Sequence, residues 1–467
     1  MRKTKIIATL GPATSSPEML GKMMDGGMNI ARLNMSHAPH DWVRRVVKDL
    51  RAAAEARKIS IGIMLDTQGP AIRTGDLPVA LDLQPGQKFT LTVRGEQSEE
   101  LHSVDVNYEH FVSDISVGDV VLFDNGQIHM KVLKKFANKV ECEVLTPGKL
   151  GSRRHINLPG VKVSLPALTA KDLADIAVGL EVGVDFIALS FVREARDIMQ
   201  LRSVIERSKH QPLVIAKIED QQAVKNLAAI IDASDAVMIA RGDLGIEIPY
   251  EELPIVQRRI VKACLRAGRP VIVATHMLES MIENPMPTRA EITDVANAVY
   301  EQADAIMLSG ETTVGKYPLK CLEVFDKISQ RIERSGGAAF HKNAELTSPR
   351  QKLVRSAVIM ADDLRAHAVV VFTLRGSMAR YAAWMRPAFS PIFAVCENWQ
   401  LADSLALNWG VTPLVHPFDH AFPEKTIETA LDKLVASGKL KKGQTAVIIS
   451  AISAGEQIVD AVELRVV

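Results

Sequence analysis

The chain has 467 residues, of which 47% are hydrophobic and 24% are charged, so it is long enough for two or three globular domains with substantial cores. Lysine plus arginine (56) almost balances aspartate plus glutamate (55). With this balance, the chain has no large net positive charge that would attract nucleic acid or an anionic membrane. We therefore expect the partners to be small molecules.

The cysteines and the hydropathy pattern predict a cytoplasmic protein. Four cysteines are scattered without C-x-x-C spacing, which argues against a zinc site or a disulfide framework and is typical of a reducing compartment. The basic segment MRKTKIIATLGPA is interrupted by Gly11 and Pro12, so its apolar run is far shorter than a secretion signal requires. No uninterrupted apolar stretch approaches the ~20 residues that span a bilayer.

Short β-branched runs alternate with helical patterns along much of the chain, and this alternation predicts parallel strands joined by crossover helices. Eight such strands match the number in a closed (β/α)8 TIM barrel. We expect this barrel to comprise residues 1–69 and 165–338. The predicted strands are TKIIATLG, MNIARLNMS, ISIGIMLDT, VDFIALSF, LVIAKIED, AVMIARGDLG, PVIVATHM and AIMLSGET.

Nearly all of these strands become polar at their last positions. Any one polar end alone would be explained by a strand that reaches solvent. The carboxyl ends of barrel strands converge on one face, however, and active sites lie there. The side chains that we expect on this face are Arg32, Asn34, Ser36, Asp66, Thr67, Ser190, Lys217, Glu219, Arg241, Asp243, Thr275, Ser309 and Glu311.

The alternation of strands and helices breaks after the third predicted strand. Residues 70–164 contain short alternating runs separated by turns, with Asp-Asn-Gly at 124–126 as a hairpin signal, and they predict an inserted all-β domain. An insertion at this point leaves the barrel at its catalytic face, where it could close as a lid or have a purely structural role. Its basic segment KLGSRRH could contact phosphate, but an ordinary solvated loop is the favoured interpretation.

A separate C-terminal α/β domain is expected over residues 346–467, after a linker rich in glycine and polar residues around 335–350. Within it, AHAVVVFTLRGSMARYAAWMRP predicts a strand, a loop and a helix. The loop would present N–H groups and hydroxyls at a helix N-terminus, as phosphate sites do, although a plain strand-to-helix turn explains it equally well. The candidate effector-binding residues are Thr373, Arg375, Gly376, Ser377 and Arg380.

The strand ends carry oxygen ligands suited to magnesium. Glu219 and Asp243 end adjacent predicted strands, and Mg²⁺ binds through one or two carboxylates while waters and substrate oxygens complete its coordination. Lys217 projects from the same strand face as Glu219 and could neutralise charge on a phosphoryl group or an enolate. These residues predict a magnesium-dependent enzyme that acts on a small phosphorylated or carboxylated substrate.

Other strand-end residues have both a functional and a structural interpretation. Arg32 could bind phosphate, or it could pair with Asp66. Gly242 and the amides after it could hold a carboxylate at the start of a helical turn, whereas Asp243 could cap that turn. Thr275 offers a hydroxyl on the facing side.

Seven motifs resemble the successive signatures of the pyruvate kinase family, in that family's order and spacing, over essentially the whole chain. The resemblance implies transfer of the phosphoryl group of phosphoenolpyruvate to ADP, giving pyruvate and ATP in glycolysis. It also implies Mg²⁺ or Mn²⁺, often K⁺, and a homotetramer. The motifs are TKIIATLGPA, ARLNMSHA, LDTQGPAIRTG, AKIED, ARGDLGIEIP, ATHMLESMIENPMPTRAEITDVANAV and MLSGETTVGKYP.

The resemblance also implies roles for individual residues. Lys217 would stabilise the transferred phosphoryl group and the enolate, and Thr275 would supply the proton of the methylene carbon directly or through water. The implied substrate contacts are Arg32, Ser190, Lys217, Gly242, Asp243 and Thr275, the nucleotide contacts are Arg73, Lys171, Asn34 and His37, the Mg²⁺ ligands are Glu219 and Asp243, and the K⁺ ligands are Asn34, Ser36, Asp66 and Thr67.

Several positions depart from the family pattern. Gln68 replaces a lysine, and Ala71 replaces the glutamate associated with K⁺ dependence, which predicts weaker K⁺ activation than is usual. His276 replaces a glutamine and Val314 a lysine, so we expect the nucleotide contacts to differ. The final loop, SAISAGEQIVDA, lacks the family's effector-loop pattern, but the TLRGSMAR loop could still bind a sugar phosphate.

Two other functions are compatible with parts of this pattern. An aldolase or lyase on the same barrel would share Glu219 and Asp243, but it would not need Arg73 and Lys171. A non-catalytic effector-binding protein would be expected to lose Lys217 or one of the two carboxylates. All of these residues are present, which favours the kinase.

Overall fold

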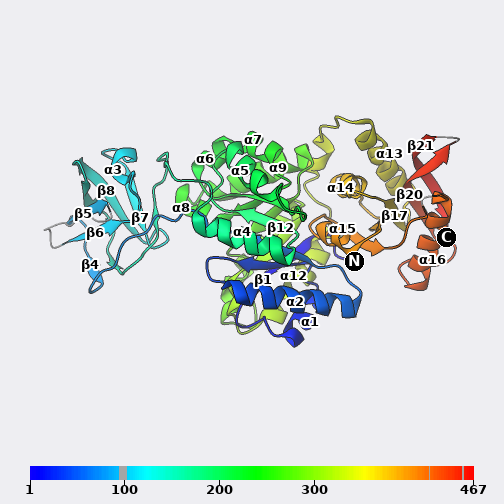
Figure 1. Cartoon of the computed structure of the whole chain (residues 1–467), viewed down its shortest axis with the longest axis horizontal. Coiled ribbons are helices and arrows are strands. Elements are labelled where there is room, and N and C mark those ends of the chain that lie inside the picture. The colour runs from blue at the N-terminus through cyan, green and yellow to red at the C-terminus, as the bar shows by residue number, and fades with distance from the viewer. Residues whose placement is uncertain (94–101, 420, 455–456) are drawn as a thin grey trace.

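A closed barrel of eight parallel strands forms the centre of the computed structural model, which describes residues 1–93, 102–419, 421–454 and 457–467. Figure 1 shows the inserted domain at one end of this barrel and the C-terminal domain at the other. All eight predicted strands are confirmed. In spatial order they are β1 (Lys5–Thr9), β16 (Ala305–Leu308), β15 (Val271–Ala274), β14 (Ala236–Ala240), β13 (Leu213–Ile218), β12 (Phe186–Leu189), β3 (Gly62–Asp66) and β2 (Ile30–Asn34).

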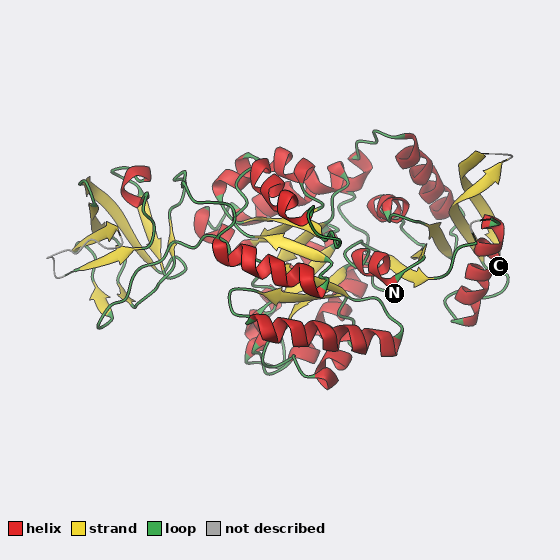
Figure 2. Ribbon diagram, viewed as in Figure 1, coloured by secondary structure: helices red, strands yellow, loops and turns green. Residues whose placement is uncertain are grey.

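Helices surround the barrel strands, as Figure 2 shows. Their starts follow from local sequence, since Ser16, Thr169 and Thr288 each accept an N–H of the first turn. Two of the helices end at glycines with positive φ. The helical elements are α1 (Pro17–Asp25), α2 (His40–Arg57), α4 (Ala170–Val182), α5 (Ala195–Ile205), α6 (Gln221–Lys225), α7 (Leu227–Ala233), α8 (Arg241–Glu247), α9 (Leu253–Ala267), η1 (Glu279–Ile282), α10 (Arg289–Tyr300), α11 (Gly310–Thr313), α12 (Pro318–Glu333) and η2 (Phe340–Asn343).

The insertion folds around its own apolar core into a six-stranded and a two-stranded sheet. The predicted hairpin at 124–126 joins β7 to β8, and all three of its residues have positive φ. Among the described residues of the insertion, one short helix, α3 (Phe111–Asp114), interrupts the run of strands. The strands are β4 (Leu81–Leu83), β5 (Lys88–Val93), β6 (Ser103–Val106), β7 (Val120–Phe123), β8 (Ile128–Lys135), β9 (Lys139–Val144), β10 (Gly148–Leu150) and β11 (Ile156–Asn157).

The C-terminal part is a five-stranded sheet with helices, in the strand order β19, β18, β17, β20, β21. The predicted strand, loop and helix are β17, the loop after it and α14. The segment predicted as the final loop, 450–461, differs from the prediction, because residues 450–454 belong to β20 and residues 457–461 to β21, which pair as an antiparallel hairpin. Residues 455–456 lie outside the described residues. The elements are α13 (Pro349–Asp363), β17 (Ala368–Phe372), α14 (Ser377–Trp384), β18 (Ile392–Cys396), α15 (Trp399–Ser404), β19 (Val411–Val415), α16 (Pro423–Ala436), β20 (Thr445–Ala454) and β21 (Gln457–Val466).

Several polar contacts attach the C-terminal domain to the barrel, among them those of Arg51 and Trp384. The guanidinium of Arg51 on α2 pairs with Asp185 of the barrel at 2.8 Å and with Asp403 of α15 at 2.7 Å. The indole N–H of Trp384 donates to the carbonyl of Leu265 near the end of α9 at 2.5 Å. These contacts hold the domain against the side of the barrel that lies away from the insertion (Figure 1).

The four cysteines are free and buried, as the scattered spacing predicts. Among the described helices, none combines the length and the apolar character needed to cross a membrane.

The contact between Gly268 and Trp384 gives a matched test of the docking. Gly268 and Gly183 both end helices with φ of 72°, but a Cβ on Gly268 would lie 2.7 Å from the Trp384 ring, whereas a Cβ on Gly183 would meet nothing within 4 Å. Both alanine variants bear the left-handed strain, about 1–2 kcal/mol, and only Gly268→Ala adds a steric clash of about 1–3 kcal/mol. We expect calorimetry to show a larger fall in unfolding temperature for Gly268→Ala than for Gly183→Ala. Equal falls would contradict this account of the interface.

Candidate active site

A cavity of about 360 Å³ lies at the carboxyl ends of the barrel strands, on the side that faces the insertion. Side chains from β2, β13 and the segments that follow β3, β12, β13 and β14 meet on its wall, because closure of the barrel brings these strand ends together. The predicted site residues on this wall are Arg32, Asn34, Ser36, Thr67, Arg73, Ser190, Lys217, Glu219 and Asp243.

Lys217 is the most enclosed cation of this wall. Its ammonium donates to Ser190 Oγ at 2.6 Å and lies 3.1 Å from Asp66 Oδ1 and 2.9 Å from Glu219 Oε1. Burial acts to lower the pKa of Lys217, but the charges of Asp66 and Glu219 more than offset it, and the net pKa is raised. Lys217 is therefore a fixed positive charge at neutral pH.

Asp66 is shared between two cations. Arg32 Nε donates to Asp66 Oδ2 at 2.6 Å, and the ammonium of Lys217 forms an ion pair with the other carboxylate oxygen, Oδ1. Burial raises the pKa of Asp66, but Arg32 and Lys217 outweigh it and leave the pKa below its usual value. Arg32 therefore pairs with Asp66, as its structural interpretation predicts. Arg32 also lines the cavity.

Glu219 and Asp243 follow the neighbouring strands β13 and β14 and line the same cavity. Glu219 Oε2 accepts the N–H of Phe191 at 2.6 Å. Burial, together with the negative charge of Asp243, raises the pKa of Glu219 to about 7 despite the opposing charge of Lys217. Two carboxylates that face one space and repel each other suit a divalent cation, which would offset that repulsion.

Thr275 and Gly242 form a hydrogen bond with each other beside the cavity and do not line its wall. The N–H of Gly242 donates to Thr275 Oγ1 at 2.7 Å, and Thr275 has a positive φ of 67°. The amide at Gly242 thus already has an acceptor. The alternative in which Asp243 caps the turn is not seen, because the start of α8 has no side-chain cap hydrogen bond.

Lys171 and His37 also lie off the cavity wall. The ammonium of Lys171 donates to the carbonyl of Met35 at 2.6 Å and to Asp175 Oδ2 at 2.7 Å. His37 is exposed next to Ser36, and its backbone N–H donates to the carbonyl of Asn34. Both residues therefore flank the outer side of the segment that carries Asn34 and Ser36.

The insertion contributes wall residues that the sequence did not identify as site residues. Arg154 pairs with Asp124 at 3.2 Å, and both line the cavity with Arg153 and His155. The exposed side chains of Arg153 and Arg154 agree with the interpretation of KLGSRRH as a solvated loop, and its last three residues also line the cavity. Their basic character was the only sequence signal, and it could not specify which face the loop meets.

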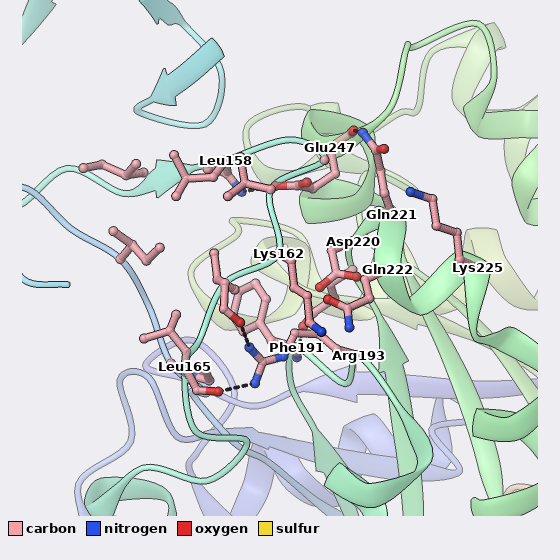
Figure 3. Close-up of a pocket in the computed structure, with 18 of the residues that line it drawn as sticks. Leu158, Lys162, Leu165, Phe191, Arg193, Asp220, Gln221, Gln222, Lys225 and Glu247 are labelled. Atoms are coloured by element: carbon pink, nitrogen blue, oxygen red, sulfur yellow. Dashed lines mark hydrogen bonds between the residues drawn. The ribbon is translucent and has the colours of Figure 1, made fainter. Parts of the chain in front are cut away.

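A second cavity, of about 470 Å³, separates the return segment of the insertion from α6 (Figure 3). Glu219 lines both cavities. Arg193, which is 7% exposed, donates from Nη1 to the carbonyl of Val163 at 2.9 Å and from Nη2 to that of Leu165 at 2.5 Å. Figure 3 shows this pair of bonds, through which Arg193 holds the return segment against the barrel.

The predicted effector loop closes on itself in the C-terminal domain. Thr373 Oγ1 accepts the N–H of Gly376 at 2.9 Å, and Gly376 has the positive φ of 81° that the turn requires. Arg380 Nη1 donates to the carbonyl of Arg375 at 3.4 Å, and burial lowers the pKa of Arg380. Ser377 begins α14, as predicted.

Comparisons with known proteins identify the family. The pyruvate kinase barrel-domain model matches residues 1–322, and the pyruvate kinase alpha/beta-domain model matches residues 351–462. The chain belongs to the pyruvate kinase family. It is 42% identical over 456 residues to plastidial pyruvate kinase 2 of Arabidopsis thaliana, with 96% of this chain and 78% of the relative covered.

Bacterial and structural relatives agree with this identification. A pyruvate kinase of Geobacillus stearothermophilus is 40% identical over 468 residues, covering 97% of this chain and 78% of that protein. The crystal structure of a pyruvate kinase from Cryptosporidium parvum superposes with a TM-score of 0.94 at 34% identity, covering 100% of this chain and 96% of that chain. The protein is thus a phosphotransferase that converts phosphoenolpyruvate and ADP to pyruvate and ATP.

The Arg193 contacts predict a role in positioning the insertion. In Arg193→Met, two carbonyls lose their donor, so we expect faster proteolysis of the 158–165 segment. We also expect a several-fold rise in KM, since this segment lines the second cavity together with Glu219. Arg196→Met is the control, because among the described residues that exposed side chain forms an ion pair with Glu194 alone. Unchanged proteolysis in Arg193→Met, measured by gel and mass spectrometry, would contradict this role.

Proposed function

We propose that Lys217 is the central catalytic residue of this pyruvate kinase. The observation that carries the proposal is its enclosed ammonium, directed at the cavity and held by Asp66, Ser190 and Glu219. A fixed positive charge in a low-dielectric site stabilises charge that develops on a transferring phosphoryl group and on the enolate. Because the barrel holds the ammonium in place, little reorganisation accompanies the reaction.

Glu219 and Asp243 are the proposed ligands of Mg²⁺, or of Mn²⁺. The family generally uses a divalent cation and K⁺. Two carboxylates on neighbouring strand ends leave coordination positions for water and for substrate oxygens, as Mg²⁺ prefers. When bound, the metal would supply positive charge for the substrate oxygens.

Arg32 and Ser190 are the proposed phosphoenolpyruvate contacts next to Lys217, since both line the cavity beside it. Gly242 and Asp243 would bound the substrate on the side of β14. Thr275 is the proposed proton donor to the methylene carbon, directly or through water. Its link to the Gly242 amide would fix the orientation of its hydroxyl.

Arg73 and Asn34 are the proposed nucleotide contacts on the cavity wall. Lys171 and His37 flank the outer side of the Asn34 segment, and we propose that they meet the nucleotide at the rim of the cavity. Arg154 and His155 from the insertion face the same space. Closure of the insertion as a lid would bring these groups closer to the nucleotide.

The remaining proposals concern ions, regulation and assembly. Asn34, Ser36, Asp66 and Thr67 are the proposed K⁺ ligands, and residues 373–377 with Arg380 form the proposed sugar-phosphate effector loop.

A cytoplasmic location is supported by the free cysteines. A homotetramer is supported by apolar side chains exposed on and near α9 and α10, which are Tyr250, Ile255, Met286, Ile292 and Tyr300.

Substitution of Lys217 separates phosphoryl transfer from proton transfer. We expect Lys217→Met to lower kcat about a thousandfold, or about 4 kcal/mol, the scale for loss of a preorganised electrostatic donor. Proton exchange at the methyl group of pyruvate should survive in Lys217→Met and fall in Thr275→Ala, because exchange involves no phosphoryl transfer. Coupled assays and proton NMR measure the two reactions. If Lys217→Met abolished both equally with substrate binding intact, the proposed division of roles would be wrong.

The residue at position 71 predicts the response to K⁺. Ala71 lines the cavity with Thr67, and it leaves less negative charge there for a monovalent cation to offset than a glutamate would. We expect substantial activity in K⁺-free buffer, and a larger activation by K⁺ in Ala71→Glu. Steady-state assays with and without K⁺ at saturating substrates measure both effects, and strong K⁺ activation of the unaltered enzyme would refute the prediction.

A further inference from the structure

A large cavity lies at the opposite end of the barrel from the active site. It has a volume of about 1080 Å³, and its wall comes from the N-terminal segment, the segment after α12, the helix α13 and the loop after α14. It lies at the amino ends of β1 and β16, between the barrel and the C-terminal domain. None of the roles proposed above uses it.

Three side-chain nitrogen atoms of this wall have no hydrogen-bond partner among the described residues. Arg386 Nε and Trp409 Nε1 belong to residues that are each only 4% exposed, and the third atom is His341 Nδ1. The first two atoms can only donate. A buried donor without an acceptor costs about 1–3 kcal/mol, so an acceptor beside these atoms would be stabilising.

The other atoms of Arg386 show that its orientation is fixed. Nη2 donates to Asp304 at 2.7 Å and to the carbonyl of Gln302 at 3.2 Å, and Nη1 donates to the carbonyl of Ala383 at 2.7 Å. Asp304 also accepts the backbone N–H of Trp409. Arg386 and Trp409 are thus held together by one carboxylate, and Nε is the nitrogen of this guanidinium that has no acceptor among the described residues.

The charges around the cavity favour an anion. Lys3, Arg334, Lys342 and Arg355 join Arg386 on the wall, whereas the acids there are Glu333 and Asp362. Both acids are already engaged, because Glu333 accepts the N–H groups of Lys3 and Thr4, and Asp362 accepts that of Ala388. Burial, with the charges of Arg386 and Lys342, lowers the pKa of His341 to about 4, so its imidazole is neutral at pH 7 and can carry its proton on Nδ1.

The wall also has an apolar part. Val358 and Met385 are buried there, and Phe389 and Ile359 are 59% and 53% exposed. These side chains would pack against a hydrocarbon or aromatic body. We propose that this cavity binds a small organic anion whose carboxylate or phosphate oxygens accept from Arg386 Nε, Trp409 Nε1 and His341, and whose apolar body contacts Phe389 and Ile359.

Four probes resolve the chemistry of this ligand on the full-length protein. Benzoate and phenyl phosphate carry both an oxyanion and a ring, whereas acetate and inorganic phosphate carry the oxyanion alone. The readout is the indole N–H resonance of Trp409, one of four tryptophans, assigned by its loss in Trp409→Phe. We expect the ring-bearing probes to shift this resonance saturably and to bind about tenfold or more tighter than the ringless ones. The tighter of benzoate and phenyl phosphate identifies the oxyanion.

Variants test the individual contacts by calorimetric titration. Trp409→Phe keeps the ring but removes the donor and should weaken binding about tenfold. Arg355→Gln, on the exposed rim, should weaken it several-fold, whereas Arg331→Gln, exposed on α12 and bonded to Ser335, should leave it unchanged. Arg355→Gln keeps the test decisive if Trp409→Phe fails to fold. The proposal is overturned if no probe shifts the Trp409 resonance at millimolar concentration, or if Arg355→Gln and Arg331→Gln bind alike.

Discussion

The buried ammonium of Lys217 is the constraint on which the rest of the active site depends. A positive charge that is only 8% exposed is tolerated because two carboxylates and a hydroxyl surround it. These partners come from β3, β12 and β13, which are neighbours in the closed barrel. The pairing of these three strands and the charge compensation are therefore linked, since a shift of β3 or β12 along β13 would separate the ammonium from its partners.

This compensation extends outward through shared partners. Asp66 holds Lys217 with one oxygen and Arg32 with the other, so the orientation of both cations depends on one side chain. Glu219 contacts Lys217 and the amide of Phe191, and it is also a proposed metal ligand. A substitution at any of these positions changes the electrostatic environment of the others, and its effects on substrate and metal binding are not expected to be independent.

Arginines contribute to the attachment of both peripheral domains to the barrel. Arg193 holds the return segment of the insertion through two carbonyls, and Arg51 ties the C-terminal domain to the barrel through Asp185 and Asp403. The planar guanidinium suits both tasks because it donates in several directions at once. The insertion can thus act on the active site from one end while the C-terminal domain borders a separate cavity at the other.

The sequence by itself determined the barrel strands and most of the active-site wall. Hydrophobic runs with polar ends are local patterns, and parallel strands place their carboxyl ends together whatever the details of packing. Only the tertiary structure decided which polar ends touch. It paired Arg32 with Asp66, turned Thr275 toward Gly242, and left Lys171 beside the cavity rather than on its wall.

The contacts between domains could not be predicted from the sequence either. The basic segment 153–155 carries no local signal of the surface that it meets, so its place on the cavity wall followed only from the fold of the insertion. The same holds for Arg386 and Trp409, whose unpartnered donors adjoin a cavity formed by segments distant in the chain. Periodicity reports how each residue relates to its own strand or helix, whereas these sites depend on distances between elements, which are set by packing.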